Sequence, residues 1–342
     1  MYNFQNDYNR GCHPKVLENL QMENETQFYG YSEDPLTAQA KSKVKKALGN
    51  ESCDVHFLSG GTQSNLTVIS SILRPHQGVI SSTDGHINTH ETGAIEATGH
   101  KVIALETPDG KLTADQVHQT LEGHYADETH EHIVQPGMVY ISNPTELGTI
   151  YKKSELEAIH AVCKEFDVPL YIDGARLAMA LTARDNDLAM TDLCDLCDAF
   201  YIGGTKCGAL FGECVVLVND RYKKDFRYIM KQKGAMLAKG FALGSQFNTL
   251  FTDNLYLELG TYANHLAEKI GSALAGKVEM FQEQVTNQIF PILTSGKIAE
   301  LKNKYDFYVW CPVDEDRCAV RICVFWGTDE KVVDELIEDI LV

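Results

Sequence analysis

Short apolar segments alternate with helical patterns between residues 54 and 218, and no other feature constrains the fold of this 342-residue chain as strongly. Five apolar segments are candidate strands, at residues 79–82, 101–105, 138–142, 169–173 and 199–203. Four segments with a helical pattern are candidate helices, at residues 37–48, 65–73, 113–121 and 154–166. Strand and helix alternation predicts an α/β fold with a mostly parallel sheet and right-handed crossovers.

The chain is longer than a single hydrophobic core usually supports, and its pattern changes after Asn219. A long helical stretch from Arg221 to about Leu274 precedes a final helix from Asp329, with three apolar segments between them at residues 289–293, 307–310 and 319–323. We therefore predict a large domain, including the N-terminal segment, at residues 1–245 and a smaller C-terminal α/β domain at residues 246–342.

Lys206 follows the last candidate strand of the alternating region, within a turn of small residues. A lysine at the end of a buried strand either extends its amine back to water or takes part in chemistry. An amine held away from bulk solvent has a lowered pKa and can form a Schiff base with an aldehyde. The glycines around Lys206 leave room for a flat bound group.

Asp173 ends the candidate strand at residues 169–173, and Arg176 follows it closely. A carboxylate at the carboxyl end of a strand can lie in the crevice where open α/β sheets bind ligands. Pyridoxal phosphate needs such a carboxylate, because its ring accepts electrons best while the pyridine nitrogen stays protonated. Asp173 and Lys206, each at a strand end, match this cofactor.

A strand at residues 54–58 leads into Gly60 and Gly61, and then into a helix that should begin near Thr62. Free N–H groups at a helix start, with a hydroxyl beside them, bind phosphate. These three residues are our candidates for that task. An ordinary strand-to-helix turn has the same appearance, and the segment is neither a Walker loop nor a GxGxxG fingerprint.

His86 and His90 lie in a polar segment bounded by glycines. A histidine there can lie flat on a pyridine ring or exchange a proton with a substrate, and we favour His86. The spacing of the two histidines also suits two metal ligands on one helix face. However, the pattern is not His-Glu-x-x-His and no third ligand is evident, so we predict no metal site.

The overall composition makes several partners unexpected. A net charge of −18, from 48 acidic and 30 basic residues, leaves no broad basic face for nucleic acid or anionic lipid. No apolar run approaches the ~20 residues of a membrane span, and no signal-peptide pattern opens the chain. The single C-x-x-C pair, Cys194 and Cys197, lacks zinc-ligand partners. We expect a cytoplasmic protein with no nucleic-acid or membrane partner.

Six different short motifs follow one another in a specific order and spacing along the chain, at residues 29–35, 60–65, 86–91, 143–149, 173–176 and 203–206. With these motifs the chain resembles the low-specificity L-threonine aldolase family, within the beta-eliminating lyases. The resemblance implies a pyridoxal-phosphate-dependent transferase-like fold of the aspartate-aminotransferase type I. Such a fold has a large domain with a mostly parallel sheet and a smaller C-terminal α/β domain.

The resemblance also implies roles for the cofactor site. Lys206 becomes the residue that binds the cofactor aldehyde, and Asp173 the partner of the ring nitrogen. His86 becomes the residue that stacks on the ring. Gly60, Gly61 and Thr62 remain the candidates for the phosphate.

Substrate recognition is expected to depend on arginines. Arg176 is expected beside the cofactor and the substrate carboxylate, where a guanidinium fork suits a carboxylate. A second carboxylate-binding arginine is expected late in the chain. Arg321, on a segment of alternating polarity, is our candidate, and Arg317 is its competitor. The alternative for Arg321 is a strand residue whose charged side chain faces the solvent.

The N-terminal motif departs from many relatives, which carry Arg-Ser-Asp-Thr where this chain has residues 4–8. Asn6 would therefore replace a serine that reaches the substrate carboxylate. The resemblance further implies a homodimer or homotetramer in which neighbouring subunits complete each other's sites. Tyr29, near the substrate, and Lys239, near the cofactor phosphate, are the candidates for crossing that interface.

The implied reaction is retro-aldol cleavage of the Cα–Cβ bond of L-threonine, L-allo-threonine or a related small-molecule amino acid, which yields glycine and an aldehyde. A base must take the β-hydroxyl proton, and we consider His86 first and His132 second. β-Elimination or transamination with the same cofactor is the alternative activity. A non-catalytic protein of the same fold is the third hypothesis.

Overall fold

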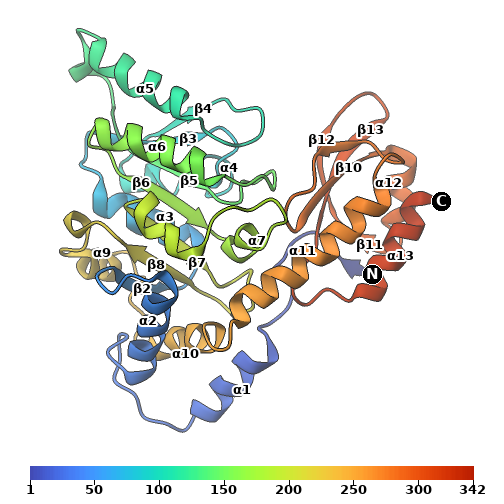
Figure 1. The fold of residues 1–342 in the computed structure, drawn as a ribbon, viewed down its shortest axis with the longest axis horizontal. Coiled ribbons are helices and arrows are strands. Elements are labelled where there is room, and N and C mark those ends of the chain that lie inside the picture. The colour runs from blue at the N-terminus through green and yellow to red at the C-terminus, as the bar shows by residue number, and fades with distance from the viewer.

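A seven-stranded sheet forms the centre of the computed structural model, which describes all 342 residues (Figure 1). Neighbouring strands are parallel except β8, which is antiparallel to both β2 and β7. The predicted α/β fold with a mostly parallel sheet is therefore confirmed. In spatial order the strands are β2 (Asp54–Leu58), β8 (Glu213–Leu217), β7 (Ala199–Gly203), β6 (Leu170–Gly174), β5 (Gln135–Ser142), β3 (Gln77–Ser82) and β4 (Val102–Leu105).

Successive residues of the central strands pack on opposite faces of this sheet. Ile172 and Phe200 belong to the largest core, whereas Tyr171 and Tyr201 belong to a second core on the other face. Because helices cover both faces, β6 and β7 are buried along their whole length. The helices in the largest core include α2 (Pro35–Leu48), α5 (Ala114–Ala126) and α6 (Lys153–Glu165), and those in the second include α3 (Gly61–Ile72) and α9 (Phe226–Gln232).

The long helical stretch predicted from Arg221 to about Leu274 is wrong as a single element. It consists of α9, α10 (Phe241–Leu250) and α11 (Leu255–Leu274). Asp253 and Asn254 have φ angles of 51° and 61°, in the left-handed region through which a right-handed helix cannot continue. The remaining helices of the large unit are α1 (Pro14–Glu23), α4 (His86–Thr89), α7 (Leu177–Leu181) and α8 (Leu193–Leu196), with 3₁₀ turns η1 (Glu96–Thr98), η2 (His130–His132), η3 (Met190–Asp192) and η4 (Asp220–Tyr222).

The C-terminal part of the chain builds a second sheet of four strands, in the order β12, β13, β10, β9. All its neighbouring strands are antiparallel. The three apolar segments predicted there correspond to three of these strands. The elements are β9 (Met280–Gln282), β10 (Gln288–Thr294), β12 (Tyr308–Pro312) and β13 (Arg317–Cys323), with α12 (Ser295–Leu301) and α13 (Glu330–Leu341) packed on them.

Helix α11 connects the two units, and its burial pattern shows how. Leu259 and Ala263 pack in the largest core, whereas Leu266 and Ile270 pack in the core of the C-terminal unit. The long orange helix in Figure 1 therefore runs from one unit into the other. A helix shared by two cores holds them together more firmly than a loop would.

The N-terminus lies on the C-terminal unit. Strand β1 (Tyr2–Asn3) pairs in parallel with β11 (Tyr305–Asp306), and Phe4 is fully buried in the core of that unit. Figure 1 accordingly shows both chain ends on the C-terminal unit. The division of the chain at residue 245 stays a prediction, and this contact shows that the first residues belong spatially with the last.

The carboxyl ends of β5, β6 and β7 meet at one edge of the large sheet. Gly203, at the end of β7, lies so close to β6 that an added Cβ would stand 2.1 Å from the carbonyl oxygen of Ala175. Only glycine permits this approach, which brings the residues after the two strands together. No helix of the chain has the length and apolar character needed to cross a membrane.

Candidate active site

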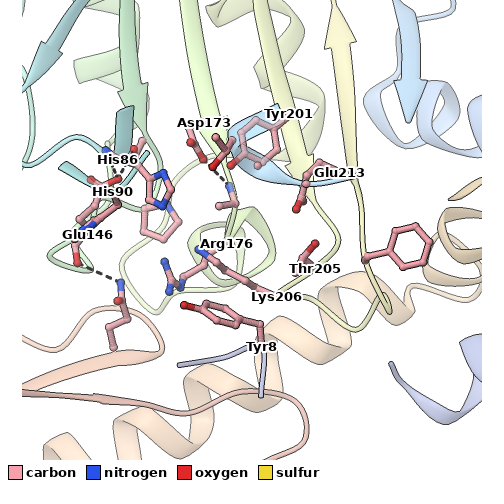
Figure 2. Close-up of a pocket in the computed structure, with 18 of the residues that line it drawn as sticks. Tyr8, His86, His90, Glu146, Asp173, Arg176, Tyr201, Thr205, Lys206 and Glu213 are labelled. Atoms are coloured by element: carbon pink, nitrogen blue, oxygen red, sulfur yellow. Dashed lines mark hydrogen bonds between the residues drawn. The ribbon is translucent and has the colours of Figure 1, made fainter. Parts of the chain in front are cut away.

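A cavity of about 550 Å³ opens at this edge of the sheet (Figure 2). Residues of the large unit line most of it, chiefly from the turns and helix starts that follow its strands. Gln288 of β10 and Arg321 of β13 line it from the C-terminal unit. Eight of the residues singled out in the sequence line it together, namely Gly60, Gly61, Thr62, His86, Asp173, Arg176, Lys206 and Arg321. The fold thus gathers residues that lie up to 261 positions apart, from position 60 to position 321.

Lys206 lies in the turn between β7 and β8, with its side chain directed into the cavity (Figure 2). Burial, and next to it the positive charge of Arg176, lowers the pKa of its amine below the ordinary value for lysine. The Tyr8 ring lies 6.0 Å from the amine nitrogen. A buried amine with a lowered pKa is more often neutral, which is the state that attacks an aldehyde.

Asp173 accepts three hydrogen bonds that fix its carboxylate in the cavity wall. The Tyr140 hydroxyl donates to Oδ2 over 2.7 Å and the Asn65 amide over 3.0 Å, while the Ala175 N–H donates to Oδ1 over 3.0 Å. Alternation along β6 places Asp173 on the same face as Tyr171, which is the face that α3 covers. This carboxylate and the start of α3 therefore lie on one side of the sheet.

Helix α3 begins at Gly61, one residue earlier than predicted, and no side chain caps its first turn. The first N–H groups of a helix have no partner within the helix, so these donors remain available at the cavity. A Cβ added to Gly61 would lie 3.2 Å from the Tyr201 hydroxyl. The uncapped helix start and its glycines form a site that suits an anion.

His86 begins α4 and is held by a carboxylate behind it. Its Nδ1 atom lies 2.7 Å from Oε1 of Glu91, which is 5% exposed and also accepts a hydrogen bond from Asn65 over 2.7 Å. This contact fixes the orientation of the imidazole ring, and a proton on Nδ1 leaves Nε2 as the acceptor. The His90 ring lies 5.7 Å away, and no group of three potential metal ligands occurs in the structure.

Arg321 reaches the cavity from β13, across the two units. Its guanidinium lies 5.5 Å from the Tyr308 ring and 5.4 Å from the Trp310 ring, and it donates one hydrogen bond to the Gln5 carbonyl. Its Nε atom is buried without a hydrogen-bond partner. An arginine that is stacked and only partly satisfied is well prepared for an incoming carboxylate.

Arg317, the competing candidate, lies outside the cavity. Its guanidinium pairs with Asp314 over 2.7 Å and with Glu279 over 2.6 Å at the surface of the C-terminal unit. The geometry therefore favours Arg321 as the second carboxylate-binding arginine.

The comparisons with known proteins agree with this geometry. The beta-eliminating lyase family model matches residues 14–289. The low specificity L-threonine aldolase of a Pseudomonas species is 30% identical over 98% of this chain and 96% of its own. A solved structure of Leishmania major threonine aldolase is 45% identical, with a TM-score of 0.96 over 99% of this chain and 98% of its own. The chain belongs to the low-specificity L-threonine aldolase family of beta-eliminating lyases.

More distant structures show that the fold of this family is shared more widely. Thermus thermophilus aspartate aminotransferase, at 13% identity, covers 99% of this chain with a TM-score of 0.69. This likeness confirms the predicted aspartate-aminotransferase type of fold.

Three residues predicted for the site lie elsewhere in this subunit. His132 is exposed in η2, before the first residue of β5, whereas the cavity lies beyond the last. A strand of eight residues spans roughly 26 Å, so His132 does not reach the cavity of its own subunit, and its role as a catalytic base stays a prediction. Tyr29 is 77% exposed and Lys239 is also exposed, and neither lines the cavity. Their assignment concerns a neighbouring subunit and stays a prediction.

Asn6 does not line the cavity either, and its neighbours take the place expected for it. Its amide oxygen accepts the Tyr8 N–H over 3.1 Å in a tight local turn. Tyr8 then lines the cavity, while Asp7 points inward and is 1% exposed. The assignment of Asn6 to the substrate carboxylate is therefore not supported by its position in this subunit.

Asp7 is a component of the site that the sequence did not reveal. Its carboxylate pairs with Arg176 through two hydrogen bonds, of 2.6 Å to Nε and 3.0 Å to NH2, and Asn287 donates a third over 2.9 Å. One edge of the Arg176 guanidinium is thus occupied, which limits the bidentate contact we expected with a substrate. Two further carboxyl groups line the cavity, the partly buried Glu146 and the buried Glu213. Glu146 lies within the motif at residues 143–149 but was given no role from the sequence, and no motif indicated Glu213.

The Asp7 contact predicts a pH-dependent contribution to stability. Burial opposes ionisation, but Arg176, Lys206 and Asn287 together outweigh it and lower the pKa of Asp7 from 3.8 to about 2. Because the folded-state pKa is depressed, the stabilisation is present above pH 3.8 and disappears as the pH falls through about 2. The difference between the unfolded-state and folded-state pKa of Asp7 corresponds to about 2 kcal/mol of folding free energy. Urea unfolding of Asp7→Asn should show a loss of about 3 kcal/mol at pH 7, and a smaller loss at pH 3.

The exposed variant Glu315→Gln provides the control, because that side chain makes no ion pair or hydrogen bond. An unfolding free energy of Asp7→Asn that runs parallel to the wild type between pH 5 and pH 3 would contradict the assignment of the low pKa to Asp7.

The residues that line the cavity fit pyridoxal 5'-phosphate. A buried amine and a fixed carboxylate stand at the ends of neighbouring strands β7 and β6, and an uncapped helix start lies on the same face of the sheet. The orphaned Nε of Arg321 additionally suits the carboxylate of an amino acid. These are the groups that this cofactor and its substrates require of a protein.

Proposed function

We propose that this protein is a pyridoxal-phosphate-dependent lyase that cleaves the Cα–Cβ bond of L-threonine, L-allo-threonine or a related β-hydroxy-α-amino acid. The products are glycine and an aldehyde. The observation that carries the proposal is the presence of Lys206 and Asp173 in one cavity with the start of α3. The names of the Pseudomonas and Leishmania major relatives support the choice of reaction within this cofactor class.

Pyridoxal 5'-phosphate is the cofactor, and when bound it draws electrons away from the α-carbon of the attached amino acid. Lys206 would supply the amine that holds the cofactor aldehyde. Asp173 would keep a proton at the ring nitrogen, and the N–H groups of Gly60, Gly61 and Thr62 would hold the phosphate.

The reaction that follows depends on how the substrate is held. Arg321, with Arg176 beside it, binds the substrate carboxylate and so selects which bond of the α-carbon is broken. His86 lines the cavity, where it would face the cofactor ring, and is our choice for the base that takes the β-hydroxyl proton. The contact with Glu91 fixes the orientation of the His86 imidazole, which both stacking on the cofactor ring and accepting the proton require.

A product assay tests the proposal directly. Purified protein with cofactor should convert L-threonine to equimolar glycine and acetaldehyde. Ammonia and 2-oxobutyrate would instead indicate β-elimination, and transfer of the amino group to a keto acid would indicate transamination. The absence of any cofactor-dependent product from L-threonine and L-allo-threonine would reject the proposed function.

The proposal includes an assembly of at least two subunits and a cytoplasmic location. Tyr29 and Lys239 are exposed and are assigned to the neighbouring site, near the substrate and the phosphate. All ten cysteines are free thiols, as suits a reducing compartment. Light scattering in solution measures the assembly, and a monomeric mass would remove the role of both residues.

A further inference from the structure

Glu213 is a buried carboxyl group of the cavity to which the proposed reaction gives no task. It begins β8 and lies in register between Leu58 of β2 and Gly203 of β7. Leu58 leads directly into the glycines before α3, and Gly203 leads directly into the turn that carries Lys206. Strand pairing therefore fixes Glu213 between the proposed phosphate site and the lysine.

The side chain of Glu213 points to the face of the sheet where α3 begins. Val215 and Leu217, further along β8, pack in the core on that face, and alternation gives Glu213 the same orientation. Glu213 is 4% exposed and lines the cavity beside Thr205 (Figure 2). Its Oε2 atom accepts the Gly204 N–H over 2.8 Å.

We propose that Glu213 is protonated in the cofactor-bound protein and donates a hydrogen bond to the cofactor phosphate. The inference rests on the proposed function, because it assumes that the phosphate lies at the start of α3. A phosphate group carries a charge of roughly −1.5 to −2 at neutral pH. An ionised carboxylate beside it would repel it, whereas a carboxylic acid has an O–H group to donate.

The surroundings of Glu213 already favour the neutral form before any phosphate is bound. Burial raises the pKa of its carboxyl group to about 7, although Thr205, the Gly204 N–H and Lys206 favour the ionised form. The negative charge of Asp173 favours protonation. The other titratable groups around Glu213 have raised pKa values because of burial and stay neutral near pH 7, namely Tyr171, Tyr201, Cys207, Cys214 and Tyr256.

A phosphate dianion that binds beside this carboxyl group must raise its pKa further. Binding of the phosphate then takes up one proton whenever Glu213 is ionised in the free protein. Below pH 7 the group is already protonated and no proton is needed. Above pH 7 the affinity for the phosphate should fall about tenfold for each pH unit.

The experiment compares pyridoxal 5'-phosphate with pyridoxal, which lacks the phosphate, by equilibrium dialysis at pH 7 and pH 9. A change in the protonation of Lys206 with pH affects the binding of both ligands. The ratio of the affinity for pyridoxal 5'-phosphate to the affinity for pyridoxal therefore reports on the phosphate contact alone. In the wild type this ratio should fall about 50-fold between the two pH values. In Glu213→Gln, whose amide donates at every pH, it should stay within about threefold. Glu157→Gln, an exposed carboxyl on α6, should behave as the wild type.

Calorimetry of the wild-type protein gives a second readout that needs no variant. At pH 8, binding of the phosphorylated ligand should take up about one proton more than binding of pyridoxal, measured in buffers of different ionisation enthalpy. Equal proton uptake by the two ligands would overturn the proposal. A Glu213→Gln ratio that follows the wild-type pH dependence would overturn it as well. Failure of the wild type to bind the cofactor at all would instead reject the proposed function.

Discussion

Replacing Lys206 with alanine is expected to lower kcat for threonine cleavage by about 10⁴-fold, the upper end of what one positioned acid–base group contributes. Lys206 is the only lysine that lines the cavity, and its lowered pKa makes its amine the natural nucleophile toward the cofactor aldehyde. The variant loses both the covalent attachment and the amine that exchanges with the substrate. Steady-state aldehyde release measures the effect.

Borohydride reduction followed by peptide mass spectrometry supplies the matching structural readout. The wild type should carry the reduced cofactor at Lys206, and the alanine variant should carry none. Lys277→Ala, an exposed lysine beyond α11, should keep both the activity and the label. Labelling at any other lysine of the wild type, or more than ~1% residual kcat in Lys206→Ala, would show that a different amine does this work.

The alternation of short apolar segments with helical patterns was enough to predict the large sheet, because strands covered on both faces are apolar along their length. The same reasoning placed Asp173 and Lys206 at strand ends. Parallel strands present their carboxyl ends at one edge, so the two residues meet although thirty-two residues separate them in the chain. The local sequence pattern and the direction of the strands are therefore enough to predict that Asp173 and Lys206 belong to one site.

Contacts between distant segments could not be predicted in this way. Asp7 is one polar residue in a polar N-terminal stretch, and only the folding of that stretch onto the C-terminal unit brings it to Arg176. Glu213 is a charged residue at the start of a short apolar strand, where sequence alone favours a solvated edge. Its burial follows from the position of β8 between β2 and β7.

The position of His132, away from the cavity of its own subunit, has a related explanation. Several histidines in a short segment before a strand resemble a catalytic site. In open α/β sheets, however, ligands bind beyond the carboxyl ends of the strands. His132 precedes β5, whereas Glu146 follows it and lines the cavity. Position relative to the strand ends is thus a better guide than residue type.

Replacing Asp173 with asparagine is expected to lower kcat by about 10³-fold, or roughly 4 kcal/mol of transition-state stabilisation. The amide has nearly the same shape, but it carries no charge to keep a proton on the ring nitrogen. Its NH2 group would also face donors, either the Tyr140 hydroxyl and the Asn65 amide at the Oδ2 position or the Ala175 N–H at the Oδ1 position. The substitution therefore removes the charge and disturbs the contacts that aim it.

Two further variants separate these effects. Tyr140→Phe removes one donor and keeps the carboxylate, so it should lower kcat by only about tenfold, in line with the loss of a hydrogen bond to a charged group. Asp115→Asn, an exposed carboxyl at the start of α5, should have no effect. Because Asp173 acts on the bound cofactor, the Asp173→Asn protein should still bind pyridoxal 5'-phosphate and still be labelled at Lys206. A variant that is labelled normally and retains more than a tenth of the wild-type kcat would mean that the ring nitrogen does not depend on this carboxylate.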